Sequence, residues 1–302
     1  MHVFVTGASG WIGSATVDEL LAAGHEVTGL ARSAKSAEAI EAKGARVRRG
    51  DLDDLDGIRA GAEEADAVIH LANKHDFDHP AVSNAAERGA VQTIGEALTG
   101  TDRPFLLASG VLGLASGRPA TEDDASPAHG PDSPRGGSEN LALEFAARGV
   151  KTVSVRFAPT VHGAGDPGFI SVIAQIARKT GVSAYPGEGT NRWAAVHRSD
   201  AARVVARGLE RAPGGSRLHA VAEEGIRTRD IAEAIGREFD LPTTSIDSGD
   251  VHDHFGWVGR FFAMDLSVTS TVTRELLDWR PTGPTLLEEL NAGVYSAFAP
   301  AT

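Results

Sequence analysis

A glycine-rich turn at the start of the chain constrains its fold more than any other feature. Residues 2–13, HVFVTGASGWIG, place glycines at the spacing T-G-x-x-G-x-x-G, directly after an apolar run and before a helical pattern. Glycines at these positions allow a tight turn and a close approach of the backbone to a pyrophosphate, to which the helix N-terminus presents its N–H groups. The pattern therefore predicts a dinucleotide-binding unit rather than a glycine turn without a ligand. The expected contacts are Thr6, Gly7, Ser9, Gly10, Trp11, Ile12 and Gly13.

Apolar runs of β type alternate with helical patterns through the first half of the chain. This alternation is typical of an α/β protein with a Rossmann-type, doubly wound parallel sheet. After Pro159 the rhythm changes, and we expect a smaller C-terminal substrate-binding region there. The predicted dinucleotide-binding domain covers residues 1–160, with about 192–222 returning to it, and the predicted substrate-binding region covers 161–191 and 223–302.

The end of the second predicted strand indicates which dinucleotide is bound. An NAD site usually carries an acidic residue there, about 20 positions after the glycines, to hold the ribose hydroxyls. This chain has Ala31 at that place, followed by Arg32, Ser33 and Lys35. A carboxylate would repel a 2′-phosphate, whereas guanidinium, ammonium and hydroxyl groups suit one. The pattern favours NADP(H); the alternative is that Arg32 is a solvated surface residue and Ser33 only caps the next helix.

Two further strand ends are expected to reach the cofactor. Asp51 and Leu52 follow the third predicted strand, where an adenine ring could be flanked. Leu71 and Ala72 end the fourth strand, close to the expected position of the cofactor. His70 precedes them, and we interpret it as a strand-end histidine with satisfied hydrogen bonds rather than as a catalyst.

Composition excludes several other classes of function. The formal charge of −12 argues against a nucleic-acid partner, which requires a basic face. No apolar run is long enough to cross a bilayer, and the absence of cysteine fits a cytoplasmic protein without disulfides. The pairs His75/His79 and His252/His254 lack a convincing third ligand, so we expect no metal site. The expected partner is a small-molecule substrate, and since the chain opens on the first strand we expect no signal peptide.

Motifs along nearly the whole chain resemble those of one family. They are TGASGWIG, GDLDD, VIHLA, RFAPTVHG, WAAVHRSD and TRELLDWRPT. Together they resemble the extended short-chain dehydrogenase/reductases, a group that includes sugar-nucleotide epimerases and dihydroflavonol-type reductases. The resemblance implies that Pro159 lies near the nicotinamide and that Asp200 sits at the start of a helix in the core. It also implies a homodimer that pairs helices around the active-site helix.

The catalytic Y-x-x-x-K motif of this family is absent. Alignment of SENLALE on the family's S-K-x-x-A-x-E form puts Arg135 at the tyrosine position and Glu139 at the lysine position. The chain has two tyrosines, Tyr185 and Tyr295, and neither has a lysine four residues later. The sequence thus resembles the atypical subgroup of the superfamily, which keeps the cofactor fold without the usual catalytic pair.

Other side chains have to be weighed as catalysts. Arg135 cannot protonate a carbonyl oxygen, because it stays charged at any workable pH, but it could clamp a developing oxyanion or an acidic substrate. Arg135 and Glu139 are four residues apart on one predicted helix, so the alternative is a surface pair worth roughly 0.2–0.5 kcal/mol. His162, at the tyrosine of the family's V-Y-G segment, is a candidate general acid. Ser109 best matches the family's substrate-orienting Ser/Thr.

Three functional hypotheses remain. The leading one is an NADP(H)-dependent oxidoreductase that reduces a small or medium apolar molecule, such as an imine or iminium, an activated C=C bond or a ketone. The second is a non-catalytic NADP-binding redox sensor or regulator, and the third, an epimerase or dehydratase, ranks last because that chemistry needs a base. The apolar stretch 254–266, HFGWVGRFFAMDL, could line the substrate pocket or simply form core.

Overall fold

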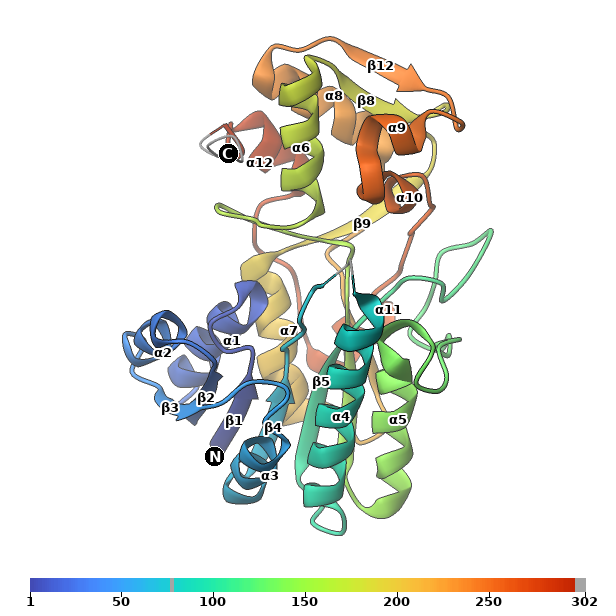
Figure 1. The fold of residues 1–302 in the computed structure, drawn as a ribbon. Coiled ribbons are helices and arrows are strands. Elements are labelled where there is room, and N and C mark those ends of the chain that lie inside the picture. Colours follow the sequence, from blue (N-terminus) through green and yellow to red (C-terminus); the bar gives the residue numbers. More distant parts are fainter. Residues whose placement is uncertain (77–78, 297–302) are drawn as a thin grey trace.

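The computed structural model describes residues 1–76 and 79–296, in two lobes (Figure 1). The larger lobe is built on a parallel sheet of strands β1 (His2–Thr6), β2 (Glu26–Ala31), β3 (Arg46–Arg49), β4 (Ala67–His70), β5 (Pro104–Gly110), β6 (Lys151–Phe157) and β10 (Arg217–Ala220). Their order across the sheet is β10-β6-β5-β4-β1-β2-β3. This order is that of a doubly wound Rossmann-type sheet with one strand added, so the predicted fold class is confirmed.

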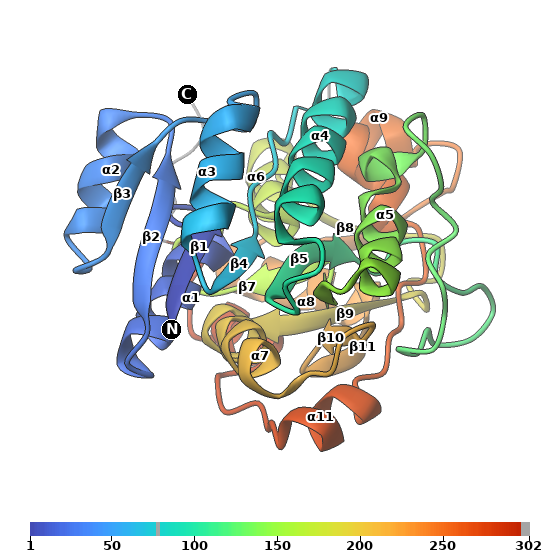
Figure 2. The ribbon, with the colours of Figure 1, turned by 90° about the horizontal axis from the view of Figure 1, so that it is seen from below.

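Helices cover both faces of this sheet, as Figure 2 shows from below. One face carries α1 (Trp11–Ala22), α2 (Ala34–Glu41), α7 (Arg198–Arg211) and α11 (Thr271–Leu277); the other carries α3 (Leu55–Glu64), α4 (Pro80–Leu98) and α5 (Ser138–Glu144). Because both faces are covered, the central strands are apolar without a break. In β1, Val3 and Val5 pack on the first face and Phe4 on the second, and each is 0% exposed.

The segment between β5 and α5 runs along the rim of the larger lobe. It ends in a short helix, η1 (Pro134–Gly137), and a second one, η2 (Phe145–Arg148), follows α5. Ala120 forms a β-bridge with Val268, and Glu122 accepts hydrogen bonds from the backbone and hydroxyl of Thr273 at 2.8 and 2.9 Å. These contacts fasten the segment to the C-terminal part of the chain.

The smaller lobe lies above the carboxyl ends of the parallel strands in Figure 1. Its strands are β7 (Thr160–His162), β9 (Arg192–His197) and β11 (Glu223–Arg227) in one sheet, and β8 (Ser183–Pro186) and β12 (Thr243–Ile246) in another. Its helices are α6 (Phe169–Thr180), α8 (Thr228–Phe239), α9 (Val251–Phe255), η3 (Gly256–Val258), α10 (Gly259–Phe262) and α12 (Leu286–Asn291). No helix in the described ranges is long and apolar enough to cross a membrane.

The C-terminal tail divides between the lobes. Two short helices, α11 and α12, flank Pro281. Leu277 at the end of α11 and Trp279 after it pack into the core of the larger lobe, whereas Leu286 and Leu290 of α12 pack into the core of the smaller one. The tail therefore returns to the parallel sheet before it completes the smaller lobe.

Candidate active site

The glycine turn packs too tightly for any side chain. Gly7 has a φ of +71°, and a Cβ there would lie 2.7 Å from the backbone nitrogen of Ala72. A Cβ on Gly13 would lie 2.0 Å from the carbonyl oxygen of Gly7. Gly10 caps α1 without a side-chain hydrogen bond, so the first N–H groups of the helix remain open to an anion. The turn thus fits the pyrophosphate of a dinucleotide.

The other residues predicted to contact the cofactor near the N-terminus lie around this turn, and together with the turn they form what we call the cradle. Trp11 opens α1 and spans to the smaller lobe: its indole nitrogen donates to the carbonyl of Val161 at 2.7 Å, and the Arg198 guanidinium lies 4.3 Å above its ring. Ser9 is exposed, and Ile12 packs against the core. Trp11 therefore joins the cradle to the first strand of the smaller lobe.

The end of β2 carries no carboxylate. Ala31 is buried, and Arg32 and Lys35 are exposed. Ser33 is the N-cap of α2, where its hydroxyl accepts the backbone N–H of Ser36 at 3.1 Å. The capping role considered for Ser33 is thus present, and its hydroxyl remains at the surface beside the two cations.

The turn after β3 is organised by its own aspartates. The Asp51 carboxylate accepts the backbone N–H groups of Asp53 and Asp54 at 2.9 and 3.2 Å. Leu52 is 7% exposed and packs into the core. Lys74, which follows β4, forms an ion pair with Asp53 at 2.7 Å. This ion pair links the turn after β3, where the sequence predicts the adenine, to the loop after β4.

His70 lies at the end of β4 and is only half satisfied. The Thr6 hydroxyl accepts the N–H of Ala72 at 3.3 Å and shares a hydrogen bond of 2.8 Å with Nδ1 of His70. The other ring nitrogen of His70, Nε2, is buried and has no partner within the described ranges. Burial, and secondarily the charge of Arg135, lower the pKa of His70 to about 3. The ring stays neutral, and the expected full satisfaction of its hydrogen bonds is wrong.

Arg135 does not lie on the same helix as Glu139, which corrects the sequence-based expectation of a surface pair. Arg135, Gly136 and Gly137 all have positive φ, at +55°, +60° and +63°, so α5 begins only at Ser138. The Arg135 guanidinium turns to α4 instead, where Nε and Nη2 donate to the buried Glu87 carboxylate at 2.9 and 2.5 Å. Its Nη1 has no hydrogen bond to a described residue, and the side chain is 36% exposed.

Glu139, at the lysine position of the family motif, is buried in a polar network. Its carboxylate accepts the Ser109 hydroxyl at 2.6 Å and is held by Nε and Nη2 of Arg156 at 2.9 and 2.5 Å. Ser109 and Arg156 are paired residues of β5 and β6, and His219 of β10 is paired with Arg156 on the other side. The three side chains therefore form a row on one face of the sheet, with Glu139 above it.

His219 extends this network and is neutral. Nη1 of Arg156 donates to Nε2 of His219 at 3.3 Å, so the proton of the ring lies on Nδ1, which donates to the carbonyl of Thr269 at 2.8 Å. Burial lowers the pKa of His219. The Glu139 carboxylate thus faces the buried guanidinium of Arg156 and, at 3.8 Å, that of the half-buried Arg217.

His162 is buried away from Ser109, in a cluster that joins three elements of the smaller lobe. Nδ1 lies 2.5 Å from Glu289 of α12 and Nε2 lies 3.6 Å from Glu223 of β11. Burial alone would lower the pKa of His162, but hydrogen bonds and charges from Glu223 and Glu289 outweigh it and raise the pKa. Because the ring is 0% exposed, no substrate can touch it in this conformation.

Two other residues named by the family resemblance lie near the junction of the lobes. Pro159 is partly buried between β6 and β7. Asp200 is buried in the first turn of α7, where it accepts the N–H groups of Thr282 and Gly283 at 2.9 and 2.8 Å. Asp200 thus orders the chain between α11 and α12.

Part of the apolar stretch 254–266 contributes to an aromatic wall in the smaller lobe, made of Phe169, Trp257 and Phe261. Phe261 stacks on Phe169 with centroids 5.4 Å apart, and Trp257 meets Phe169 edge-on at 5.7 Å. Trp257 is 40% exposed, whereas Phe255 and Phe262 are buried core. The stretch therefore provides both core and an accessible aromatic surface.

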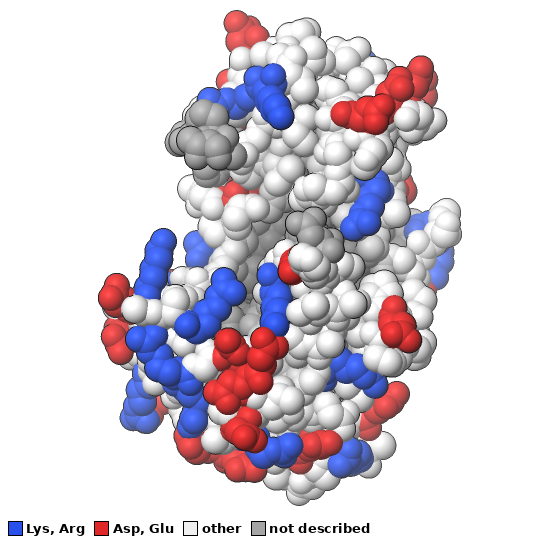
Figure 3. Space-filling model, viewed as in Figure 1, with Lys and Arg blue, Asp and Glu red and all other residues white. Residues whose placement is uncertain are grey.

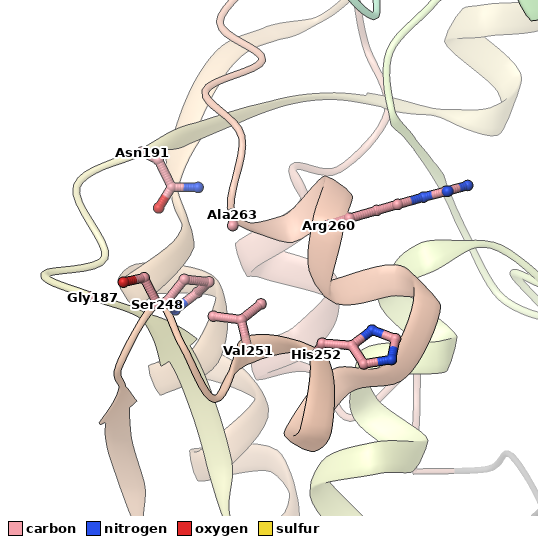
Figure 4. A pocket seen from close by; sticks show the side chains of 8 residues that line it. Gly187, Asn191, Ser248, Val251, His252, Arg260 and Ala263 are labelled. Carbon is pink, nitrogen blue, oxygen red and sulfur yellow. The ribbon is translucent and has the colours of Figure 1, made fainter.

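A pocket of about 420 Å³ opens beside this wall (Figure 4). It is lined by Pro186, Gly187, Asn191, Ser248, Val251, His252, Arg260 and Ala263. Asn191 uses its amide to hold the carbonyls of Phe262 and Met264, and Arg260 points away from the other labelled side chains. Among the residues with described positions, no group of three or more acidic or histidine side chains is arranged to hold a metal ion.

Sequence reasoning missed Glu87, Asn73 and Arg156. Asn73 and Glu87 are hydrogen-bonded to each other, and Glu87 also holds Arg135, but neither residue lies in a motif. Arg156 could have been found, because it opens the motif RFAPTVHG inside a predicted strand, and a buried arginine requires an anionic partner.

The parallel sheet, the glycine cradle and the polar strand ends define a dinucleotide-binding α/β protein. The family model described as "NAD dependent epimerase/dehydratase family" matches residues 3–220, and the chain belongs to this family. Likeness to this family and to reductases points to an NAD(P)-dependent enzyme.

Relatives cover the chain to different extents. An uncharacterized protein of Schizosaccharomyces pombe is 42% identical over 296 residues, which cover 98% of this chain and 100% of that protein. A 4-hydroxy-2-methyl-3-oxo-4-farnesyl-3,4-dihydroquinoline-1-oxide ketoreductase of Stigmatella aurantiaca is 26% identical over 223 residues, 71% of this chain and 66% of that protein. The structure of Thermus thermophilus UDP-glucose 4-epimerase with NAD matches with a TM-score of 0.74 at 22% identity, covering 99% of this chain and 100% of that one. At that identity the structural likeness shows the fold alone.

Proposed function

We propose that the protein is an NADP(H)-dependent oxidoreductase that reduces a small or medium, largely apolar organic molecule. The observation that carries the choice of cofactor is the end of β2, where Ala31 replaces a carboxylate and Arg32 and Lys35 stand exposed. Two cations and no anion at this strand end suit a 2′-phosphate, and a free ribose hydroxyl would leave them without a partner.

The cradle supplies the rest of the cofactor site. The turn at Gly7, Gly10 and Gly13 and the first N–H groups of α1 would hold the pyrophosphate, and Asp51 and Leu52 would flank the adenine. Leu71 and Ala72, which follow β4, and Pro159, which follows β6, would border the nicotinamide end. When bound, the cofactor supplies a hydride for the substrate.

The side chains near the expected reaction site favour a substrate that needs little acid from the protein. The Ser109 hydroxyl donates its proton to Glu139, so its oxygen is oriented to accept a hydrogen bond from a substrate N–H or O–H. Arg135, anchored by Glu87, keeps Nη1 for a developing negative charge. An imine or iminium, an activated C=C bond and a ketone polarised by Arg135 all fit these two groups.

The aromatic wall supports the apolar character of the substrate. Phe169, Trp257 and Phe261 present ring surface in the lobe opposite the cradle, and Trp257 is 40% exposed. Aromatic surface of this kind binds the apolar body of a ligand, while a few placed polar groups fix its orientation.

The test is oxidation of NADPH by the purified protein with a panel of imines, enones and ketones, repeated with two serine variants. Ser109→Ala is expected to lower kcat/KM by about 100-fold, because it removes an orienting group at the reaction site. The matched control is Ser154→Ala on the neighbouring strand β6, whose buried hydroxyl has no partner in the described structure. Equal activity of the two variants would contradict the role of Ser109.

A second candidate, a non-catalytic NADP-binding sensor or regulator, has one observation in its favour. Glu139 replaces the family's lysine and is fixed by Arg156, so the usual proton-transfer pair is absent. Tight binding of NADPH without turnover across the whole panel would favour this candidate over the reductase. An epimerase or dehydratase remains the weakest reading, since no free general base among the residues that the structure describes faces the site.

A further inference from the structure

The three arginines of β3 differ in their partners. Arg46 forms an ion pair with Glu26 at 2.9 Å, and Arg48 is ion-paired with Glu64. Arg49, the last residue of the strand, is exposed, and its side chain forms no ion pair or hydrogen bond with any residue in the described ranges. An arginine without an anion at a strand end is therefore left available for a ligand.

The sheet register places Arg49 directly beside the cations proposed for the 2′-phosphate. In the parallel pairing of β2 and β3, Arg49 is the partner of Ala31, the residue before Arg32. Side chains alternate along a strand, so Arg49 points to the same face as Val47. Val47 packs against the core on the side of α1 and α2, and this face also carries Lys35. Figure 3 shows Lys and Arg side chains gathered over this edge of the larger lobe, beside the hollow between the lobes.

The acidic turn that follows Arg49 does not neutralise it. Asp51 accepts two N–H groups of its own turn, and Asp54 caps α3 by accepting the N–H of Gly57 at 2.9 Å. Asp53 is paired with Lys74. These carboxylates are therefore occupied by their own backbone N–H groups or by Lys74, and none of them is paired with Arg49.

We propose that Arg49 is a third determinant of the 2′-phosphate, acting with Arg32 and Lys35 from the neighbouring strand. This inference rests on the proposed preference for NADP(H). A phosphomonoester carries between one and two negative charges near neutral pH and three acceptor oxygens, so it can engage a guanidinium from β3 together with cations from β2 and α2. Arg49 then contributes to the affinity for phosphorylated cofactor and adds nothing for NAD(H).

The test uses small probes that isolate this end of the cofactor. Binding of adenosine 2′,5′-bisphosphate and of 5′-AMP to the full-length protein is measured by calorimetry at low ionic strength, where exposed charges are least screened. The wild type is expected to bind the bisphosphate at least about tenfold more tightly than 5′-AMP. Arg49→Gln is expected to reduce this ratio by about three- to tenfold, with unchanged binding of 5′-AMP. The matched control, Arg46→Gln, alters an exposed arginine of the same strand that is already ion-paired and is expected to keep the ratio.

The outcomes separate this inference from the proposed function. A wild-type preference that survives in Arg49→Gln overturns the role of Arg49 and leaves the NADP(H) preference standing. No preference in the wild type overturns both. Arg49→Lys, which keeps the charge, is expected to retain part of the ratio. A variant with damaged folding is recognised by weaker binding of 5′-AMP as well.

Discussion

At the scale of single residues, the buried carboxylate of Glu139 holds two side chains of the sheet, Ser109 and Arg156. A lysine there would have to share a buried space with Arg156, whereas a carboxylate satisfies the guanidinium and orients Ser109 at once. Breaking such a buried pair from one side costs about 3–5 kcal/mol, because the remaining charge is left uncompensated. A lysine at position 139 would therefore leave Arg156 without its anionic partner and is expected to destabilise the fold.

His70 gives a prediction at the same scale. Its pKa is lowered from 6.5 to about 3 in the folded state, so the unfolded chain takes up a proton at a pH where the folded protein does not. The resulting stability is complete above about pH 6.5 and is lost as the pH falls toward 3, at about 1.4 kcal/mol per pH unit. Urea unfolding at pH 7 and pH 5 should therefore show a larger decrease in the free energy of unfolding for the wild type than for His70→Asn, by about 2 kcal/mol. The same pH dependence in both proteins would rule out the neutral, buried state of His70.

At the scale of elements, the cradle permits a direct substitution test. Gly13→Ala places a methyl group where a Cβ lies 2.0 Å from the Gly7 carbonyl oxygen, so the turn and the start of α1 must separate. We expect loss of dinucleotide binding and a decrease of about 3 kcal/mol in the free energy of unfolding. Gly249→Ala is the control, since a Cβ there meets nothing within 4 Å. Cofactor titration and urea unfolding measure both effects, and an unchanged Gly13→Ala variant would contradict the cradle geometry.

The elements of the larger lobe could be predicted because their signals are local. Strand runs such as HVFVT and PFLLAS are short, rich in apolar residues and bounded by turn residues, and each folds as a buried parallel strand. The β8–β12 pair was missed, because each of these strands has four residues and joins segments about 60 positions apart. These two segments form strands because they pair with each other, and neither segment alone has a sequence pattern that predicts a strand.

The candidate site was less predictable than the fold for a related reason. The run Arg135–Gly136–Gly137 reads as the first turn of a helix, but all three residues take left-handed backbone conformations, which the two glycines make accessible. This turn sends the Arg135 side chain to Glu87, 48 residues earlier, and separates it from Glu139. Tertiary contacts decide which anion each cation meets. The spacing along the sequence therefore pointed to Arg135 and Glu139 but paired them with each other, which is wrong.

At the scale of the whole molecule, the two lobes are held together by polar contacts around β7 and β9. Trp11 and Arg198 link the cradle to the strand that carries His162, and Asp200 anchors the segment leading to α12. His162 in turn contacts Glu289 on α12. The relative position of the two lobes thus depends on these polar contacts, which accounts for a histidine at this position without a role in proton transfer to a substrate.

The central claim is that the cleft between the lobes holds a 2′-phosphorylated dinucleotide. The most direct test is calorimetric titration of the full-length protein with NADPH and, separately, with NADH under identical conditions. The cations at the ends of β2 and β3, which have no ion pair with any residue that the structure describes, lead us to expect NADPH to bind at least about tenfold more tightly than NADH. Tighter binding of NADH, or no binding of either, would contradict the account.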